Sequence, residues 1–196
     1  MRQQEAIYLR EILNKIETTN VNPILNIGSS TKKFREEKNL IYRNSFFHPL
    51  ENNGYKFIHS DLKQGEGVDI YGDIFSESVQ QIISPKNPRS ILLTNVLEHI
   101  ADRKTLAETC LKLISSCGYL FISVPLSYPY HADPIDTYYR PIPSEIAQLF
   151  PNTTIVNSKI IEAGSLVTDT KSKKALVFFL KYVLRLFCHL TSQRYG

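Results

Sequence analysis

The feature of this sequence that most constrains its fold is a series of short runs that are apolar throughout, with longer polar or amphipathic stretches between them. A run without polar alternation is typical of a strand buried on both faces, and such strands form parallel sheets covered by helices. The sequence therefore predicts an α/β fold, a three-layer sandwich built on a mostly parallel sheet. The expected strands are residues 23–28, 55–62, 90–97, 118–125 and 153–161, and residues 68–75 are expected to be a short extended piece.

Two helices can be recognised from the spacing of their apolar residues. The first spans residues 3–17, and the residues that recur on one side of it are Ala6, Leu9, Leu13 and Ile16. The second follows Asp102, a residue type that caps helix N-termini. We expect its buried face to consist of Leu106, Cys110, Leu113 and Cys117.

The charge of the chain is unevenly distributed. Its net charge is +4, yet residues 171–196 hold six Lys or Arg and no acid, which leaves 17 basic and 19 acidic groups in residues 1–170. We expect a domain over 1–170 and a separate basic, apolar helix over 171–196. A nearly neutral body lacks the basic face that tracks a phosphate backbone, so no nucleic-acid partner is expected.

The cysteines and the N-terminus indicate the compartment. Cys110, Cys117 and Cys188 form no CxxC pair and have no histidine at zinc-ligand spacing, so we expect reduced, mostly buried thiols and no metal. The first residues mix charged and apolar side chains and lack the continuous apolar segment of a signal peptide. Both features predict a cytoplasmic protein.

Polar residues end several of the expected strands, where ligands bind in a parallel α/β sheet. Gly28 and Ser29 follow the first run, Asp61 and Asp73 the next two, and Asn95 the fourth. A glycine permits close backbone approach, and an acid at the second strand can accept from ribose hydroxyls, as Asp73 can from an adenine amino group. Singly, each is more simply a turn or a cap. Their shared edge predicts a nucleoside site.

A dense polar loop follows the expected strand 118–125. In SVPLSYPYHADPIDTYYR, residues 123–140, four tyrosines accompany His131, Asp133, Asp136 and Arg140. One interpretation is a reaction site, because histidine titrates near neutral pH. The other is that these side chains pin a proline-rich loop through local hydrogen bonds.

These motifs carry a resemblance to a known family. The segment 94–150, with NVLEHI, a helix and then GYLFISVP, resembles the second half of S-adenosylmethionine-dependent methyltransferases with the Rossmann-like fold, of the type-11-like group. LNIGSS resembles the family's first nucleotide-binding motif, and HSDL and VDIYGDIF its ribose and adenine segments. The resemblance covers about residues 20–161. It implies a Rossmann-like sandwich, although the family's final antiparallel strands are not evident.

The resemblance also implies a function and a set of site residues. The expected reaction is methyl transfer from S-adenosylmethionine to a hydroxyl or carboxyl of a small molecule, glycan or lipid. In this interpretation His131 is the base, and Asp133 orients it. The expected substrate contacts are His99, Tyr130, Asp136 and Arg140, and the expected cofactor contacts are Asn26, Gly28, Ser29, Asp61, Asp73 and Asn95.

Two alternatives remain beside this interpretation. Asn26 stands where the family commonly has an acid, and Gly28 is followed by Ser29, Ser30 and Thr31 where the family has further glycines. These departures leave open a catalytically silent relative that binds a nucleoside ligand or a partner protein. A nicotinamide-dependent oxidoreductase is disfavoured, since GSSTKKF does not supply the G-x-G-x-x-G fingerprint.

The last apolar stretch of the chain has its own interpretation. In a helix over 173–190, Val177, Lys181, Arg185 and His189 form a narrow, largely basic stripe beside a wide apolar face. This pattern is typical of a helix that lies on an anionic membrane surface, and it is too short and charged to span a bilayer. The alternatives are a helix buried against the sheet and a homodimer contact.

Overall fold

The fold is built on one parallel sheet. The computed structural model describes residues 2–128 and 135–162. Five strands hydrogen-bond in the order β3-β2-β1-β4-β5, and every pair is parallel. The strands are β1 Ile24–Ile27, β2 Phe57–Asp61, β3 Ile70–Tyr71, β4 Ser90–Thr94 and β5 Tyr119–Ser123.

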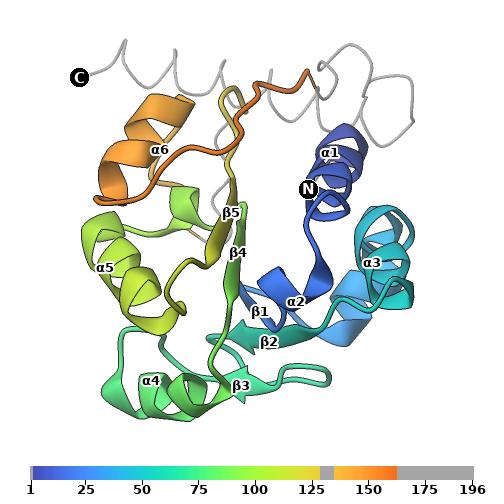
Figure 1. The fold of residues 1–196 in the computed structure, drawn as a ribbon, viewed down its shortest axis with the longest axis horizontal. Helices are drawn as coiled ribbons and strands as arrows, with labels where there is room; N and C mark the ends of the chain where they lie inside the picture. The colour runs from blue at the N-terminus through green and yellow to red at the C-terminus, as the bar shows by residue number, and fades with distance from the viewer. Residues whose placement is uncertain (1, 129–134, 163–196) are drawn as a thin grey trace, which may run out of the picture. The chain divides into compact units, whose positions relative to one another are not determined.

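Helices cover both faces of this sheet (Figure 1). The α-helices are α1 Gln3–Leu13, α2 Thr18–Val21, α3 His48–Asn52, α4 Glu77–Ile83, α5 Arg103–Leu113 and α6 Pro143–Leu149. Shorter or wider helical turns are η1 Phe34–Lys38, η2 Tyr42–Phe47, η3 Ser84–Lys86 and η4 Leu97–His99. In Figure 1, α1 and α3 lie on one side of the strands and α5 and α6 on the other. This is a Rossmann-like three-layer α/β fold, as the sequence predicts.

Alternation of side chains along each strand explains the two apolar cores. In β4, Ile91 and Leu93 pack into the cluster that contains α4 and α5 residues, whereas Leu92 packs into the cluster that contains α1, η2 and α3 residues. Successive side chains of a strand point to opposite faces, so a strand that is apolar throughout supplies both cores. Burial of both faces is therefore the reason that β1 and β4 lack polar alternation.

One expected strand is wrong. Residues 153–161 form no strand, and Ile155, Val156 and Ile160 are 52%, 79% and 59% exposed. This segment lies instead against α1, where the Tyr8 hydroxyl donates to Asn157 and the Lys159 ammonium lies 5.2 Å from the Tyr8 ring centroid. An apolar run becomes a strand only when a neighbouring strand pairs with its backbone, and no strand of the described part of the chain pairs with residues 153–161.

The expected helices form but end earlier than the sequence spacing indicates. α1 stops at Leu13, four residues before the expected end. Asp102 caps α5 as predicted, since its carboxylate accepts from the Thr105 N–H at 3.0 Å. The expected burial of Cys117 is wrong, because the helix ends at Leu113 and Cys117 is exposed with φ of +60°.

The remaining expectations concern the C-terminal segment. Backbone contacts group Met1–Ile161 into one compact unit and Glu162–Gly196 into another. The expected boundary at residue 170, the helix over 173–190 and Cys188 lie outside the described residues. Within residues 2–128 and 135–162, none of the helices has both the length and the apolar character needed to cross a bilayer.

Candidate functional site

The candidate site lies at the carboxyl edge of the sheet, where the loop after β1 closes onto the end of β2. The Gly28 and Ser29 N–H groups both donate to the Ser60 carbonyl, at 2.9 and 3.0 Å. The Ser30 N–H donates to Asp61 Oδ2 at 2.7 Å, and the Lys63 N–H donates to Asp61 Oδ1 at 3.0 Å. The Asp61 carboxylate thus accepts hydrogen bonds from the loop after β1 and from the loop after β2. The sequence-predicted residues Gly28, Ser29 and Asp61 are brought together.

A buried arginine binds the backbone of the loop after β1. Arg35, in η1, is 6% exposed, and its guanidinium donates to the carbonyls of Ser29 at 3.2 Å, Ser30 at 2.5 Å and Gly67 at 2.7 Å. Burial lowers the pKa of Arg35, an effect that nearby carboxylates, Asp69 foremost, oppose. The planar fork of the guanidinium therefore ties the loop after β1 to the loop between β2 and β3.

Gly28 is required at its position for two reasons. Its φ is +72°, in the region that favours glycine, and a Cβ added there would lie 2.9 Å from Val96 Cγ2. The close neighbour is thus a side chain of the segment after β4. Gly28 allows the two loops that follow β1 and β4 to approach each other.

Gly28→Ala is expected to lower the free energy of unfolding more than Gly54→Ala. Gly54 has φ of +86° but nothing within 4 Å of an added Cβ, so it is a matched control for the backbone cost alone. That cost is about 1–2 kcal/mol, and the crowded site adds about 1–3 kcal/mol of overpacking. Urea unfolding of both variants measures the difference. Equal losses would mean that Val96 moves aside freely.

Asn26 lies within β1, and its side chain contacts the neighbouring strand β2. It is 3% exposed, and its Nδ2 lies 3.1 Å from His59 Nδ1. Burial, and then the charge of Arg35, lowers the pKa of His59 to about 4, so the imidazole is neutral at pH 7 and Nδ1 can accept from Asn26. The role of Asn26 that the structure shows is to join β1 and β2. Its contact with a cofactor remains a prediction.

Asp73 occupies an exposed turn that leads into α4. Its Oδ1 accepts from the Phe75 N–H at 3.0 Å, and its carbonyl accepts from the Ser76 N–H at 2.9 Å. These bonds form the local turn that an aspartate commonly makes. The expected contact of Asp73 with an adenine amino group stays a prediction.

A second polar group lies at the ends of β4 and β5. Asn95 follows β4 with φ of +53°, its N–H donates to the Ser123 carbonyl at 2.9 Å, and its side chain donates to Glu5 Oε1 at 3.2 Å. Ser123, the last residue of β5, also donates to Glu5 Oε1, at 2.5 Å. Helix α1 therefore brings a carboxylate to the sheet edge beside the predicted residue Asn95.

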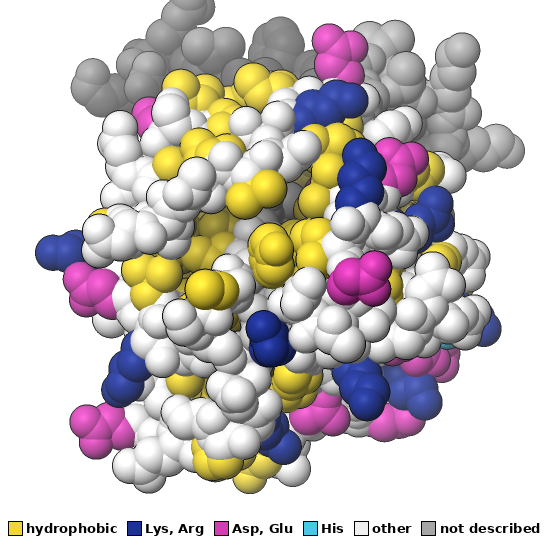
Figure 2. All heavy atoms as spheres, in the orientation of Figure 1, with side chains coloured by type: hydrophobic (Ala, Val, Ile, Leu, Met, Phe, Trp, Pro, Cys, Tyr) yellow, Lys and Arg dark blue, Asp and Glu magenta, His cyan; other side chains and the backbone are white. Residues whose placement is uncertain are grey.

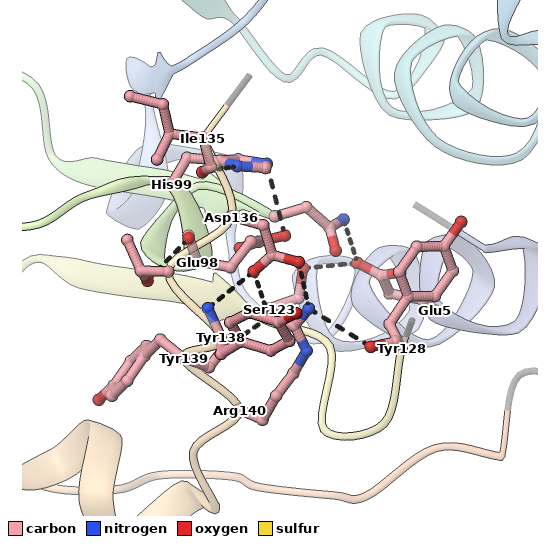
Figure 3. A network of polar contacts seen from close by, with 12 residues as sticks. Glu5, Glu98, His99, Ser123, Tyr128, Ile135, Asp136, Tyr138, Tyr139 and Arg140 are labelled. Carbon is pink, nitrogen blue, oxygen red and sulfur yellow. Dashed lines mark hydrogen bonds and ion pairs between the residues drawn. The ribbon is translucent and has the colours of Figure 1, made fainter. Parts of the chain in front are cut away.

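Residues 135–140, the last part of the polar loop, bind the residues of η4 (Figure 3). Arg140 makes a bidentate pair with Asp136, with Nη2–Oδ2 at 2.6 Å and Nη1–Oδ1 at 3.1 Å. The Thr137 N–H and hydroxyl both donate to the Glu98 carbonyl at 2.9 Å, and His99 Nδ1 donates to the Ile135 carbonyl at 2.8 Å.

These contacts agree with the second interpretation of the polar loop, in which its side chains hold the loop in place by local hydrogen bonds. The bonding partners of Asp136, Arg140 and His99 are other residues of this chain. Their contact with a substrate remains a prediction. Tyr130, His131 and Asp133 lie outside the described residues. In residues 2–128 and 135–162, no group of three or more His, Cys, Asp or Glu is placed to hold a metal ion.

Two residues of this region were not found from the sequence. Arg35 stands in the charged run FREEK, which is typical of a solvated surface, so nothing marks it as buried. Glu5 precedes Leu9 by one helical turn and so borders the apolar stripe of α1. That position on the helix was the available signal that Glu5 faces the body of the protein.

The space-filling view shows a hollow near the middle of one face, with hydrophobic side chains around it (Figure 2). Ligand sites are commonly concave and mainly apolar, with a few placed polar groups.

Comparisons with known proteins add no identification. The chain matches no family model, no curated protein and no solved structure. Its class is therefore defined by the fold alone, a Rossmann-like α/β protein with polar residues gathered at the carboxyl ends of its strands.

Proposed function

We propose that this protein transfers a methyl group from S-adenosylmethionine to a hydroxyl or carboxyl of a small molecule, glycan or lipid. The observation that carries the proposal is the position of Asp61 at the end of β2, directly beside the loop after the central strand β1. In sheets of this kind an acid at that strand end binds ribose hydroxyls. This position of an acid is the feature of the edge that supports a nucleoside cofactor.

The hydrogen-bonding capacity of Asp61 supports this assignment. A carboxylate offers about four acceptor positions. The Ser30 and Lys63 N–H groups each use one. The capacity that remains is sufficient for the two hydroxyls of a ribose, and the half-buried Asp61 is accessible to them. The residues proposed to hold the cofactor are Asn26, Gly28, Ser29, Asp61, Asp73 and Asn95.

The methyl group of S-adenosylmethionine is already activated by the attached sulfonium. The protein must therefore align the acceptor and keep water out. In the proposal His131 removes the acceptor's proton and Asp133 orients the imidazole. The proposed acceptor contacts are His99, Tyr130, Asp136 and Arg140. The last two, joined by their ion pair, would shape the wall of the acceptor site.

One observation favours the second candidate, a catalytically silent domain. The N–H groups of Gly28, Ser29 and Ser30 already donate to Ser60 and Asp61, so this loop satisfies its own donors. A loop that closes on itself offers fewer groups to an anionic ligand than an open glycine-rich loop does.

Turnover separates the two candidates. The purified chain is incubated with S-adenosylmethionine and panels of hydroxyl- and carboxyl-bearing small molecules, glycans and lipids, and release of S-adenosylhomocysteine is measured. The proposal predicts release that depends on one acceptor class and that His131→Ala lowers at neutral pH. Tight cofactor binding with no release above the acceptor-free rate would favour the silent domain.

A further inference from the structure

Glu5 joins the first helix to the ends of two strands. Its Oε2 accepts from the Arg2 N–H at 3.0 Å, which is an ordinary cap of the helix N-terminus. Its Oε1 accepts from Asn95 Nδ2 at 3.2 Å and from Ser123 Oγ at 2.5 Å. Capping accounts for one oxygen only. The other oxygen is held at the carboxyl edge of the sheet, as Figure 3 shows for Glu5 and Ser123.

The surroundings of this carboxylate are polar. Tyr42, from η2, lies close enough that its hydroxyl is affected by Thr94 and by the charges of Glu5 and Glu98. Burial is the main reason that the pKa of Tyr42 is raised to about 12, so this hydroxyl stays protonated at neutral pH. The groups around Glu5 are thus neutral: Asn95, Ser123 and Tyr42. Glu98, the other acid whose charge acts on Tyr42, is buried, with 2% of its surface exposed.

The order of the strands places this carboxylate near the proposed cofactor site. β4 is the neighbour of β1, and Ile27 is in register with Leu93. The loop that contains Gly28 and the segment that begins with Asn95 therefore leave adjacent strands at the same edge. A Cβ on Gly28 would even meet Val96. A ligand bound between these two segments would lie beside Asn95, whose side chain contacts Glu5.

We infer that Glu5 recognises the positive charge of the sulfonium of S-adenosylmethionine. The inference rests on the proposed function. Asn26 is neutral and faces His59, so the end of β1 supplies no charge to the site. Glu5 supplies one from a different element, and an anion within a few ångströms of a cation in a partly desolvated site stabilises it. S-adenosylhomocysteine, a neutral thioether at the same position, gains nothing from Glu5.

The test compares two ligands that differ in this charge. Glu5→Gln keeps an oxygen that can accept from Asn95 and Ser123 but removes the charge. By titration calorimetry, its affinity for S-adenosylmethionine should fall about tenfold while its affinity for S-adenosylhomocysteine stays within about twofold of native. Glu11→Gln, an exposed charge on the same helix, is the matched control and should change neither affinity.

Other results distinguish the inference from its alternatives. Equal loss of both affinities in Glu5→Gln overturns it and makes Glu5 a residue that only ties α1 to the sheet. If the native chain binds neither ligand, the proposed function itself fails. The native chain gives an independent arm should Glu5→Gln not fold. Its preference for S-adenosylmethionine over S-adenosylhomocysteine should weaken as the salt concentration rises, because ions screen the attraction between Glu5 and the sulfonium, and a preference that salt leaves unchanged overturns the inference.

Discussion

Asp61→Ala is expected to bind S-adenosylhomocysteine about ten- to hundredfold more weakly than the native chain. The loss of a charged acceptor for two ribose hydroxyls costs about 1.5–3 kcal/mol. The variant also removes the acceptor of the Ser30 and Lys63 N–H groups, which loosens the loop after β1. Both effects act in the same direction. Titration calorimetry at one temperature and salt concentration measures the change.

Asp102→Ala is the matched control for this experiment. Asp102 also accepts from a backbone N–H, that of Thr105 at 3.0 Å, but its role is to cap the N-terminus of α5. It should lose some stability and leave the affinity for S-adenosylhomocysteine unchanged. An Asp61→Ala variant that binds as tightly as the native chain would show that the ribose assignment is wrong.

Arg35→Lys is expected to lower the free energy of unfolding by about 3 kcal/mol, although the substitution keeps the charge. Three carbonyls from two loops accept from the guanidinium fork, and hydrogen bonds to charged groups contribute about 1.5–3 kcal/mol each, not additively. An ammonium cannot reach all three. Because Ser29 and Ser30 belong to the loop after β1, which is proposed to hold the cofactor, affinity for S-adenosylhomocysteine should fall as well.

Arg43→Lys provides the comparison, since Arg43 is an exposed residue of η2 close to Arg35 in sequence. It should change neither stability nor affinity. Urea unfolding followed by circular dichroism measures the first quantity, and calorimetry the second. If Arg35→Lys is as stable as native, the fork geometry is not what holds the two loops together.

The centre of the sheet could be predicted from the sequence because its strands are buried on both faces. β1 and β4 are neighbouring strands inside the sheet, every residue of both is buried, and this burial explains their continuous apolar runs. The same reasoning failed at 153–161, where an apolar run has no partner strand in the described structure. Periodicity reports that a segment can be a strand, whereas pairing is decided by its neighbours in space.

The candidate site was predictable only where it is carried by strand ends. Gly28 and Asn95 directly follow β1 and β4, and Asp61 ends β2, so parallel pairing brings them to one edge. Glu5 reaches that edge from a helix 90 residues away in sequence from Asn95, and Arg35 reaches it from a charged helical turn, so only tertiary packing shows their direction. Local pinning of the polar loop was one of two interpretations of the sequence, and the ion pair of Asp136 and Arg140 is a contact of that kind.

The most direct test of the central claim is calorimetric titration of the native chain with S-adenosylhomocysteine, with a nicotinamide dinucleotide as the comparison ligand. A nucleoside site formed by Asp61 and the loop after β1 predicts saturable binding of one S-adenosylhomocysteine per chain, with a dissociation constant below about 1 mM, and no binding of the dinucleotide. Absence of S-adenosylhomocysteine binding up to about 1 mM would contradict the account, as would preference for the dinucleotide.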